Sequence, residues 1–180
     1  MARLSLFQKL PGAEQSAQVF AVIALINYSW AILRFFYRFP SWLYYSSAGE
    51  VGVFFTYVMV VNLLESALLL AFCFLASVIL PQGWFYERFV SRSVSLAVPG
   101  LGYLMYVNYN FPSAYSYPLA SYTHALTVFI VIALLAILID GIAFLRNLLE
   151  AFANRAVVFL YLIAPVSAVA LLVVLFRNIF

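Results

Sequence analysis

The chain has 180 residues, of which 67% are hydrophobic, 19% aromatic and 8% charged. A soluble domain carries about 25% charged and about 45–50% apolar residues, so this composition excludes a water-soluble globular protein and predicts an integral membrane protein. The net charge is +3, and the nine Lys and Arg residues are spread along the chain; this argues against a nucleic-acid partner, which needs a clustered basic face.

The spacing of apolar segments predicts the membrane-spanning helices. A bilayer core of about 30 Å requires ~20 mostly apolar residues in a helix. Four segments meet this requirement: residues 18–36, 54–80, 122–145 and 157–176. The first of them runs on without a signal-peptide cleavage site, so we expect it to be retained as a span. No stretch between spans reaches the ~50 residues of an independent domain, so residues 1–180 are predicted to form one polytopic transmembrane domain.

A fifth segment, residues 93–111, is long enough to span a bilayer but has a proline and two glycines near its middle. Membrane helices tolerate both residue types where neighbouring helices satisfy the freed carbonyl groups, so we predict a kinked third span here. The expected fold is therefore an all-α integral membrane protein, a bundle of about five transmembrane helices.

Basic residues predict the orientation, because Lys and Arg concentrate in short cytoplasmic loops. Five spans place six basic residues on the side of the N-terminus and three on the other side, whereas four spans split them five to four. We therefore predict five spans, with a cytoplasmic N-terminus and an extracytoplasmic C-terminus, in a membrane such as the bacterial inner or plasma membrane. The first group is Arg3, Lys9, Arg88, Arg92, Arg146 and Arg155, and the second is Arg34, Arg38 and Arg177.

Aromatic side chains gather where the spans are expected to leave the bilayer, as amphipathic rings do at headgroup depth. The densest group, residues 30–47, predicts a turn and a short interfacial helix over residues 39–45 on the external surface. Residues 108–123 carry no charge and predict an external loop that contacts another chain. An ordinary aromatic belt and a lipid-headgroup or quinone-ring site are the alternatives. The candidate interface residues are Tyr109, Tyr115, Tyr117, Tyr122 and His124.

Glu65 is the most informative polar residue, because it falls near the middle of the second span. A charge at that depth costs at least ~2.5 kcal/mol, so Glu65 must face protein, be protonated, or both. We expect a protonated Glu65 that donates a hydrogen bond. Asn62 lies one turn away, and Asn27 lies at matching depth on the first span. This arrangement predicts a contact between Asn27 and Glu65. A proton or cation relay through Glu65 is the alternative.

Asp140 is the other acidic residue inside a predicted span. It lies five residues before the end of the span over residues 122–145, about 7.5 Å deep at 1.5 Å per residue. We predict that it forms a buried salt bridge or capping contact with Arg146 or Arg155. Participation in an ion path is the alternative.

The chain has one histidine, His124, and one cysteine, Cys73. These counts exclude a bis-histidine haem and a thiolate metal cluster held by this chain alone. The sequence also lacks the motifs of a serine hydrolase and of a Gly-rich phosphate loop. We therefore expect a protein that is not an enzyme, with no metal site and no cofactor.

Few polar residues lie inside the predicted spans, whereas transporters place several around a midplane substrate. The first hypothesis is a non-catalytic structural or accessory subunit of a larger membrane assembly, of the respiratory or photosynthetic electron-transfer kind, in contact with lipids and other transmembrane subunits. The second is a small proton-coupled transporter or channel module centred on Glu65. The third rests on architecture: five spans with a cytoplasmic N-terminus and an external C-terminus resemble the membrane anchors of lipoteichoic-acid-synthase and phosphoethanolamine-transferase enzymes. That resemblance implies a detached anchor that positions a partner enzyme.

Overall fold

The computed structural model describes residues 11–80, 85–110 and 119–179, with side chains from residue 123 onward in the last range. These residues are almost entirely helical, and no β-strand occurs among them. The described chain is thus an all-α bundle, as its composition predicts. Its elements are α2 (Ala13–Tyr45), α3 (Ala48–Ile79), the 3-10 turn η1 (Tyr86–Arg88), α5 (Phe89–Asn110), α6 (Leu119–Gly141) and α7 (Ala143–Ile179).

Four of the described helices, α2, α3, α6 and α7, are long and apolar enough to cross a membrane. The fifth long helix, α5, is less apolar because its first half carries Ser91, Arg92, Ser93 and Ser95. The three serines are buried in the bundle, so these polar groups face protein and leave the outer surface of α5 apolar enough for a bilayer. The structure therefore confirms a membrane bundle of four to five spanning helices.

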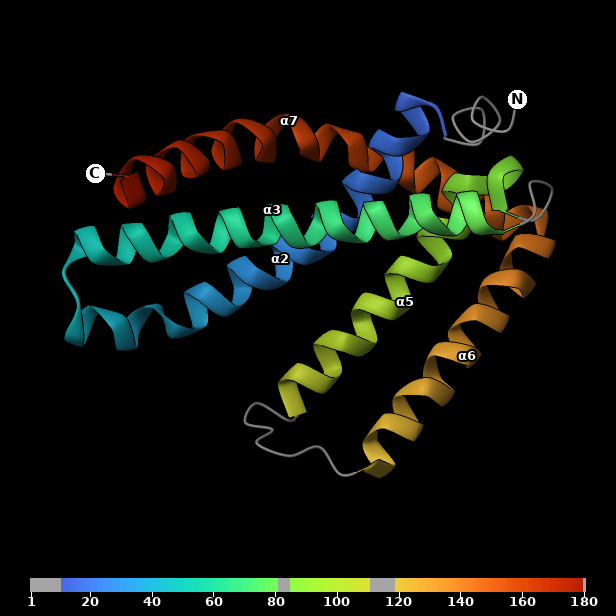
Figure 1. The fold of residues 1–180 in the computed structure, drawn as a ribbon, viewed down its shortest axis with the longest axis horizontal. Helices are drawn as coiled ribbons and strands as arrows, with labels where there is room; N and C mark the ends of the chain where they lie inside the picture. The colour runs from blue at the N-terminus through green and yellow to red at the C-terminus, as the bar shows by residue number, and fades with distance from the viewer. Residues whose placement is uncertain (1–10, 81–84, 111–118, 180) are drawn as a thin grey trace.

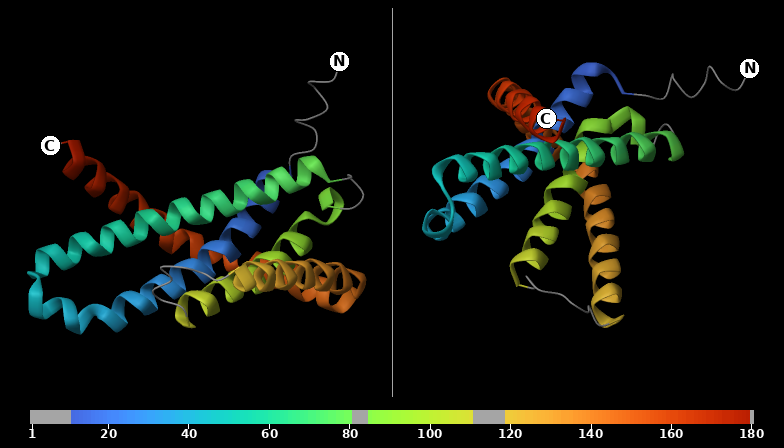
Figure 2. Two further views of the ribbon diagram at one scale, coloured as in Figure 1. Left: turned by 60° about the horizontal axis from the view of Figure 1, so that its bottom comes forward. Right: turned by 60° about the vertical axis from the view of Figure 1, so that its left-hand side comes forward.

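The helices form two groups (Figures 1 and 2). α2, α3 and α7 pack against one another, whereas α5 and α6 form a hairpin that diverges from them, with α5 also contacting α2 and α7. Successive long helices reverse direction, as five spans require. The start of α2, the end of α3, the start of α5 and the α6–α7 junction lie toward one end of the molecule, on the right in Figure 1. We call this the junction end.

The first helix is longer than its sequence predicts. α2 continues without interruption through Pro40 to Tyr45, in place of the expected turn and separate helix over residues 39–45. Proline removes one backbone donor, which a membrane helix tolerates by bending, and the last turns of α2 do bend (Figure 1). The 33 residues of α2 extend for about 50 Å, more than the ~30 Å of a bilayer core, so part of α2 tilts or leaves the hydrocarbon.

A capping box sets the start of α3. The Ser47 backbone N–H donates to Glu50 Oε2 at 2.7 Å, and the Glu50 N–H donates to Ser47 Oγ at 3.4 Å. These bonds satisfy two of the N–H groups that a helix start leaves without a partner. The connection between α2 and α3 consists of two residues, Ser46 and Ser47.

The boundary between the last two helices also differs from the expectation. α6 ends at Gly141 and α7 begins at Ala143, so Ile142 alone separates them. Glycine is a poor helix former, which explains why the span ends here and not at residue 145. Residues 146–155 are the first turns of α7, and the loop predicted for them is not present.

Two clusters make up the core of the described residues. The first packs α2 against α5 and α7 at the junction end, around Val22, Phe89 and Ala153. The second joins α2, α3 and α7 around Tyr28, whose side chain is fully buried. The Tyr28 hydroxyl donates to the Met59 carbonyl oxygen at 3.1 Å and lies 2.7 Å from Ser167 Oγ. One α2 side chain therefore bonds to both neighbouring helices.

Candidate functional site

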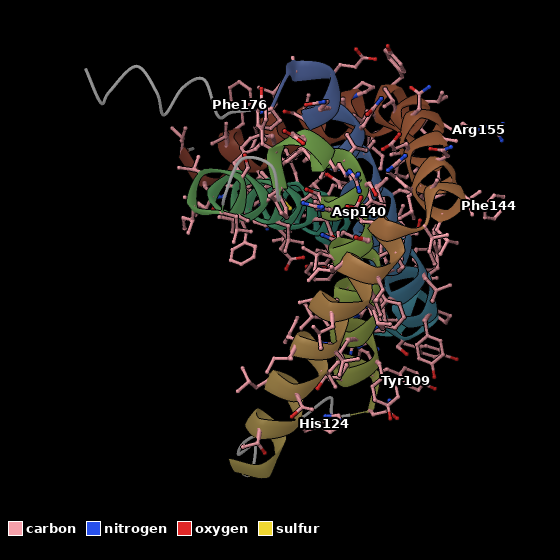
Figure 3. All side chains as sticks on the ribbon, turned by 90° about the vertical axis from the view of Figure 1, so that its right-hand side faces the viewer. Tyr109, His124, Asp140, Phe144, Arg155 and Phe176 are labelled. Atoms are coloured by element: carbon pink, nitrogen blue, oxygen red, sulfur yellow. The ribbon has the colours of Figure 1, made fainter. Side chains whose placement is uncertain are left out.

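An ion-pair cluster fastens α6 to α5 at the junction end. Asp140, in the last turn of α6, is 1% exposed. Arg92 donates to Asp140 Oδ2 through Nε at 2.9 Å and through Nη2 at 2.6 Å, and Arg88 Nη1 donates to the same oxygen at 2.9 Å. Ser91 Oγ completes the cluster by donating to Asp140 Oδ1 at 3.3 Å. Figure 3 shows Asp140 where α6 meets α5.

Asp140 thus forms a buried salt bridge, but its partners are Arg88 and Arg92 in place of the predicted Arg146 or Arg155. α6 ends one residue after Asp140, so the two predicted partners lie on the next helix, α7. The Asp140 carboxylate instead faces the start of α5. Arg155 lies apart from Asp140 (Figure 3). Arg88 ends η1 and Arg92 lies in the first turn of α5, so both stand at the start of this helix. Their four-residue spacing, typical of neighbours on a helix, is the sequence signal that could have identified them.

A groove between α3 and α5, with α2 as its floor, is the second polar feature. Its volume is about 410 Å³. Leucine and methionine side chains form most of its walls, and four polar side chains line it. Asn108 of α5 is the one member of this set that is not among the candidate residues predicted from the sequence. The four are Asn27, Asn62, Glu65 and Asn108.

Inside this groove, Glu65 does not make the predicted contact. Asn27 Nδ2 donates instead to Ser66 Oγ at 3.3 Å, and Asn62 Nδ2 donates to the Val58 carbonyl oxygen at 2.8 Å. Glu65 is exposed, and it has no hydrogen bond or ion pair among the described residues. The contact predicted between Asn27 and Glu65 is therefore wrong, and Glu65 donates no hydrogen bond among the described residues. Consecutive helix residues point about 100° apart, and it is Ser66 that faces α2.

The groove continues toward the junction end as an apolar cavity of about 180 Å³. Leu69, Leu101 and Leu104 line both parts. Phe72 and Cys73, about two turns beyond Glu65 on α3, line only the apolar part. The groove therefore has a carboxyl group and amides near mid-α3 and hydrocarbon walls beyond them.

Two of the candidate interface residues, Tyr109 and His124, lie at the far end of the α5–α6 hairpin (Figure 3). Tyr109 is 68% exposed. His124 is also exposed, and its Nδ1 lies 3.2 Å from the Tyr103 hydroxyl. This contact joins α5 to α6 at the end opposite the Asp140 ion pair. The side chains of Tyr115, Tyr117 and Tyr122 lie outside the described residues.

Comparisons of this chain with protein-family models, with curated proteins and with solved structures find no match. Within the described ranges, no group of three or more His, Cys, Asp or Glu side chains is arranged to hold a metal ion. The functional argument therefore rests on the geometry of the ion-pair cluster and the groove.

Proposed function

We propose that this chain is a non-catalytic accessory subunit of a larger membrane assembly, in which it packs against other transmembrane chains. The observation that carries the proposal is Glu65, an exposed carboxyl group halfway along α3 that has no hydrogen-bonding partner among the described residues. An acidic side chain at the centre of a bilayer costs at least about 2.5 kcal/mol when it faces hydrocarbon. Lipid tails offer it no partner, whereas a neighbouring polypeptide can.

The depth of Glu65 strengthens this argument. Glu65 is 17 residues from Ala48 and 14 residues from Ile79, which corresponds to about 26 Å and about 21 Å from the two ends of α3. It is also the only Asp, Glu, Lys or Arg within residues 51–80. A glutamate side chain is far shorter than either distance, so it cannot reach water by extending along the helix. A partner at the same depth would satisfy it.

The orientation is part of the proposal. Four basic residues lie at or near the junction end, in η1, the first turn of α5 and the first turns of α7, and three lie toward the opposite ends of α2 and α7. Lys and Arg favour the cytoplasmic side. We therefore place the junction end and the N-terminus in the cytoplasm and the C-terminus outside a plasma membrane, such as a bacterial inner membrane. The four are Arg88, Arg92, Arg146 and Arg155, and the three are Arg34, Arg38 and Arg177.

A small proton-coupled transporter or channel module is the second candidate, because the groove gathers Glu65 and three asparagines in the middle of the bundle. Proton pathways use chains of titratable groups, and Glu65 is the only acid that lines the described groove. This favours the accessory subunit. The kind of assembly stays a prediction: it could be an electron-transfer complex, or the chain could be a detached anchor that positions a partner enzyme.

The proposal is tested on the full-length chain in its native membrane. After cross-linking in intact membranes and extraction in mild detergent, native electrophoresis should show the chain in a stoichiometric complex with other transmembrane chains. Glu65→Leu should lower the yield of this complex, and the control Glu150→Gln, which changes an exposed acid in the first turns of α7, should not. A chain that leaves the native membrane as a stable monomer would overturn the proposal.

A further inference from the structure

One face of α3 carries a stripe of exposed apolar side chains at the spacing that helix packing uses. Members of the stripe follow one another at intervals of three or four residues, and each is between 48% and 78% exposed. Such a stripe lets the ridges of one helix pack into the grooves of another. Glu65 lies within the stripe. Its apolar members are Val61, Leu64, Leu68, Phe72, Leu75 and Ile79.

The stripe borders the groove between α3 and α5. Glu65 and Leu68 belong to both, so the surface continues from the outer face of α3 into the groove. On the other side of the groove, Leu104 of α5 is also 48% exposed. α3 and α5 separate with distance from the junction end (Figures 1 and 2). Because Glu65, Leu68 and Leu104 of its lining are all exposed, the groove is open to a side chain that enters from the membrane.

The charge of the groove lining indicates which kind of side chain the groove could bind. Its described lining contains one acid and no base. The amide groups of Asn27 and Asn62 donate to Ser66 and to the Val58 carbonyl oxygen. The other N–H donors of the lining, Trp30 and Asn108, make no hydrogen bond to Glu65. Glu65 therefore has no donor from its own chain within the described residues. An anion would be repelled by this lining, and a lipid tail would leave the carboxyl group without a partner. A cationic side chain would complement it.

A second copy of the chain matches this requirement less well. Asn27, which bonds to Ser66, marks the depth of Glu65 on α2, and Arg34, the nearest basic residue on α2, is seven residues away, about 10 Å along the helix. A second copy packed through α3 would therefore bring another Glu65 or neutral side chains to this depth. The Arg34 guanidinium already lies over the Trp30 ring, 5.5 Å from its centroid, so a different chain is the better source of the cation.

We infer that the groove between α3 and α5 is the docking site for a transmembrane helix of a partner chain, whose Lys, Arg or His side chain pairs with Glu65. This inference rests on the proposed accessory function and specifies the chemistry of the contact. A basic side chain within a bilayer has the same need for a counter-charge as an acidic one. The ion pair satisfies both groups, while the leucines of the α3 stripe pack against the apolar face of the partner helix.

The first test uses the purified full-length chain in phosphatidylcholine vesicles with synthetic Leu/Ala transmembrane peptides, read by energy transfer between labelled chain and peptide. A peptide with one central Lys should bind about tenfold more tightly than the same peptide with a central Leu. Glu65→Gln should remove most of this preference, and Glu150→Gln should keep it. Equal affinities for the central-Lys and central-Leu peptides would overturn the inference. So would a peptide with a central Glu, which mimics a second copy, if it bound as tightly as the central-Lys peptide.

The second test separates the inference from the proposed function. A photo-reactive residue replaces Leu68 in the groove or, as a matched control, the exposed Val158 on α7, and cross-links are mapped in native membranes by mass spectrometry. The photo-reactive residue at position 68 should cross-link to a transmembrane segment of another chain. A basic residue of that segment should lie within one helical turn of the cross-linked site. If the chain co-purifies with partners but position 68 cross-links only to lipid or to segments without a basic residue, the inference fails and the proposed function stands. If no partner co-purifies, the proposed function fails.

Discussion

At the residue scale, Asp140 holds two guanidinium groups with one carboxylate. Asp140→Asn should leave Arg88 and Arg92 without their counter-charge, and breaking a buried ion pair costs about 3–5 kcal/mol. Because the Arg88 side chain is 42% exposed, water compensates part of this loss, so we expect the free energy of unfolding to fall by about 2–3 kcal/mol. Unfolding of the detergent-solubilised chain in sodium dodecyl sulfate, followed by circular dichroism, measures it.

The two arginines provide the internal comparison for this prediction. Arg92 donates two hydrogen bonds to the Asp140 carboxylate, and its side chain is 14% exposed. Arg88 donates one to the carboxylate and one to the Asp140 backbone carbonyl oxygen, and its side chain is 42% exposed. Arg92→Ala should therefore destabilise the chain more than Arg88→Ala. Equal effects of the two substitutions, or no effect of Asp140→Asn, would contradict the view that this cluster fastens α6 to α5.

Glu65 gives the second residue-scale prediction, because it stabilises nothing within the described chain. Glu65→Leu should leave the unfolding free energy of the isolated chain unchanged or raise it, since a carboxyl group leaves an exposed membrane face. The same substitution should weaken association with partners by about 0.6–2 kcal/mol, the range for interhelical hydrogen bonds. Glu65→Gln should also weaken association, because an amide keeps the hydrogen-bonding capacity but not the charge that pairs with the partner's cation. If Glu65→Gln abolished activity while assembly stayed intact, Glu65 would relay protons, because an amide does not titrate.

At the scale of elements, Tyr28 connects three helices through one hydroxyl group. Tyr28→Phe keeps the buried ring but removes the bonds to Met59 and Ser167, so we expect a loss of about 0.6–1.7 kcal/mol in unfolding free energy. Tyr161→Phe, on a side chain of α7 that is 79% exposed, is the matched control. Detergent unfolding monitored by tryptophan fluorescence compares them, and identical curves would mean that packing alone holds α2 to α3 and α7.

The junction between α6 and α7 shows how one weak position divides an apolar stretch. Gly141 and Ile142 end α6, and α7 then continues for 37 residues, about 55 Å at 1.5 Å per residue. This exceeds the ~30 Å of hydrocarbon. Its first turns carry Arg146, Glu150 and Arg155, so they suit the membrane interface, and the uncharged turns that follow suit the bilayer core.

At the scale of the whole molecule, the alternating directions of the five long helices predict opposite locations for the two ends of the chain. A reporter fused after Phe180 should be extracytoplasmic, and Leu148→Cys, exposed in the first turns of α7, should be labelled from the cytoplasm in a chain with Cys73→Ser. Membrane-impermeant maleimide in intact and opened cells measures the cysteine. Finding both sites on one side of the membrane would contradict the five-span arrangement.

The diverging α5–α6 hairpin carries the last prediction. Tyr109 and His124 are exposed at its far end, and residues 108–123 contain no charge to hold their aromatic rings in water. Tyrosine is enriched and charge depleted in protein interfaces, so this end should be protected by another chain in the assembly. Hydrogen exchange of residues 108–123 should be slower in the native complex than in the isolated chain. Equal exchange rates would assign these rings to the headgroup layer.

The sequence by itself determined the membrane class and the positions of the long helices, because about 20 apolar residues in a row must be helical where no water can bond to the backbone. It also singled out Asp140 and Glu65, since each is an acid within an apolar helix. The tertiary structure decided what these acids touch. Apolar residues occur on every side of α3, so hydropathy alone does not set its rotation about its own axis, and packing against α2 turns Ser66 inward and Glu65 outward. Likewise, the partner of Asp140 depended on where α6 ends and on which helix lies beside it. The hydropathy of the sequence specifies neither of these.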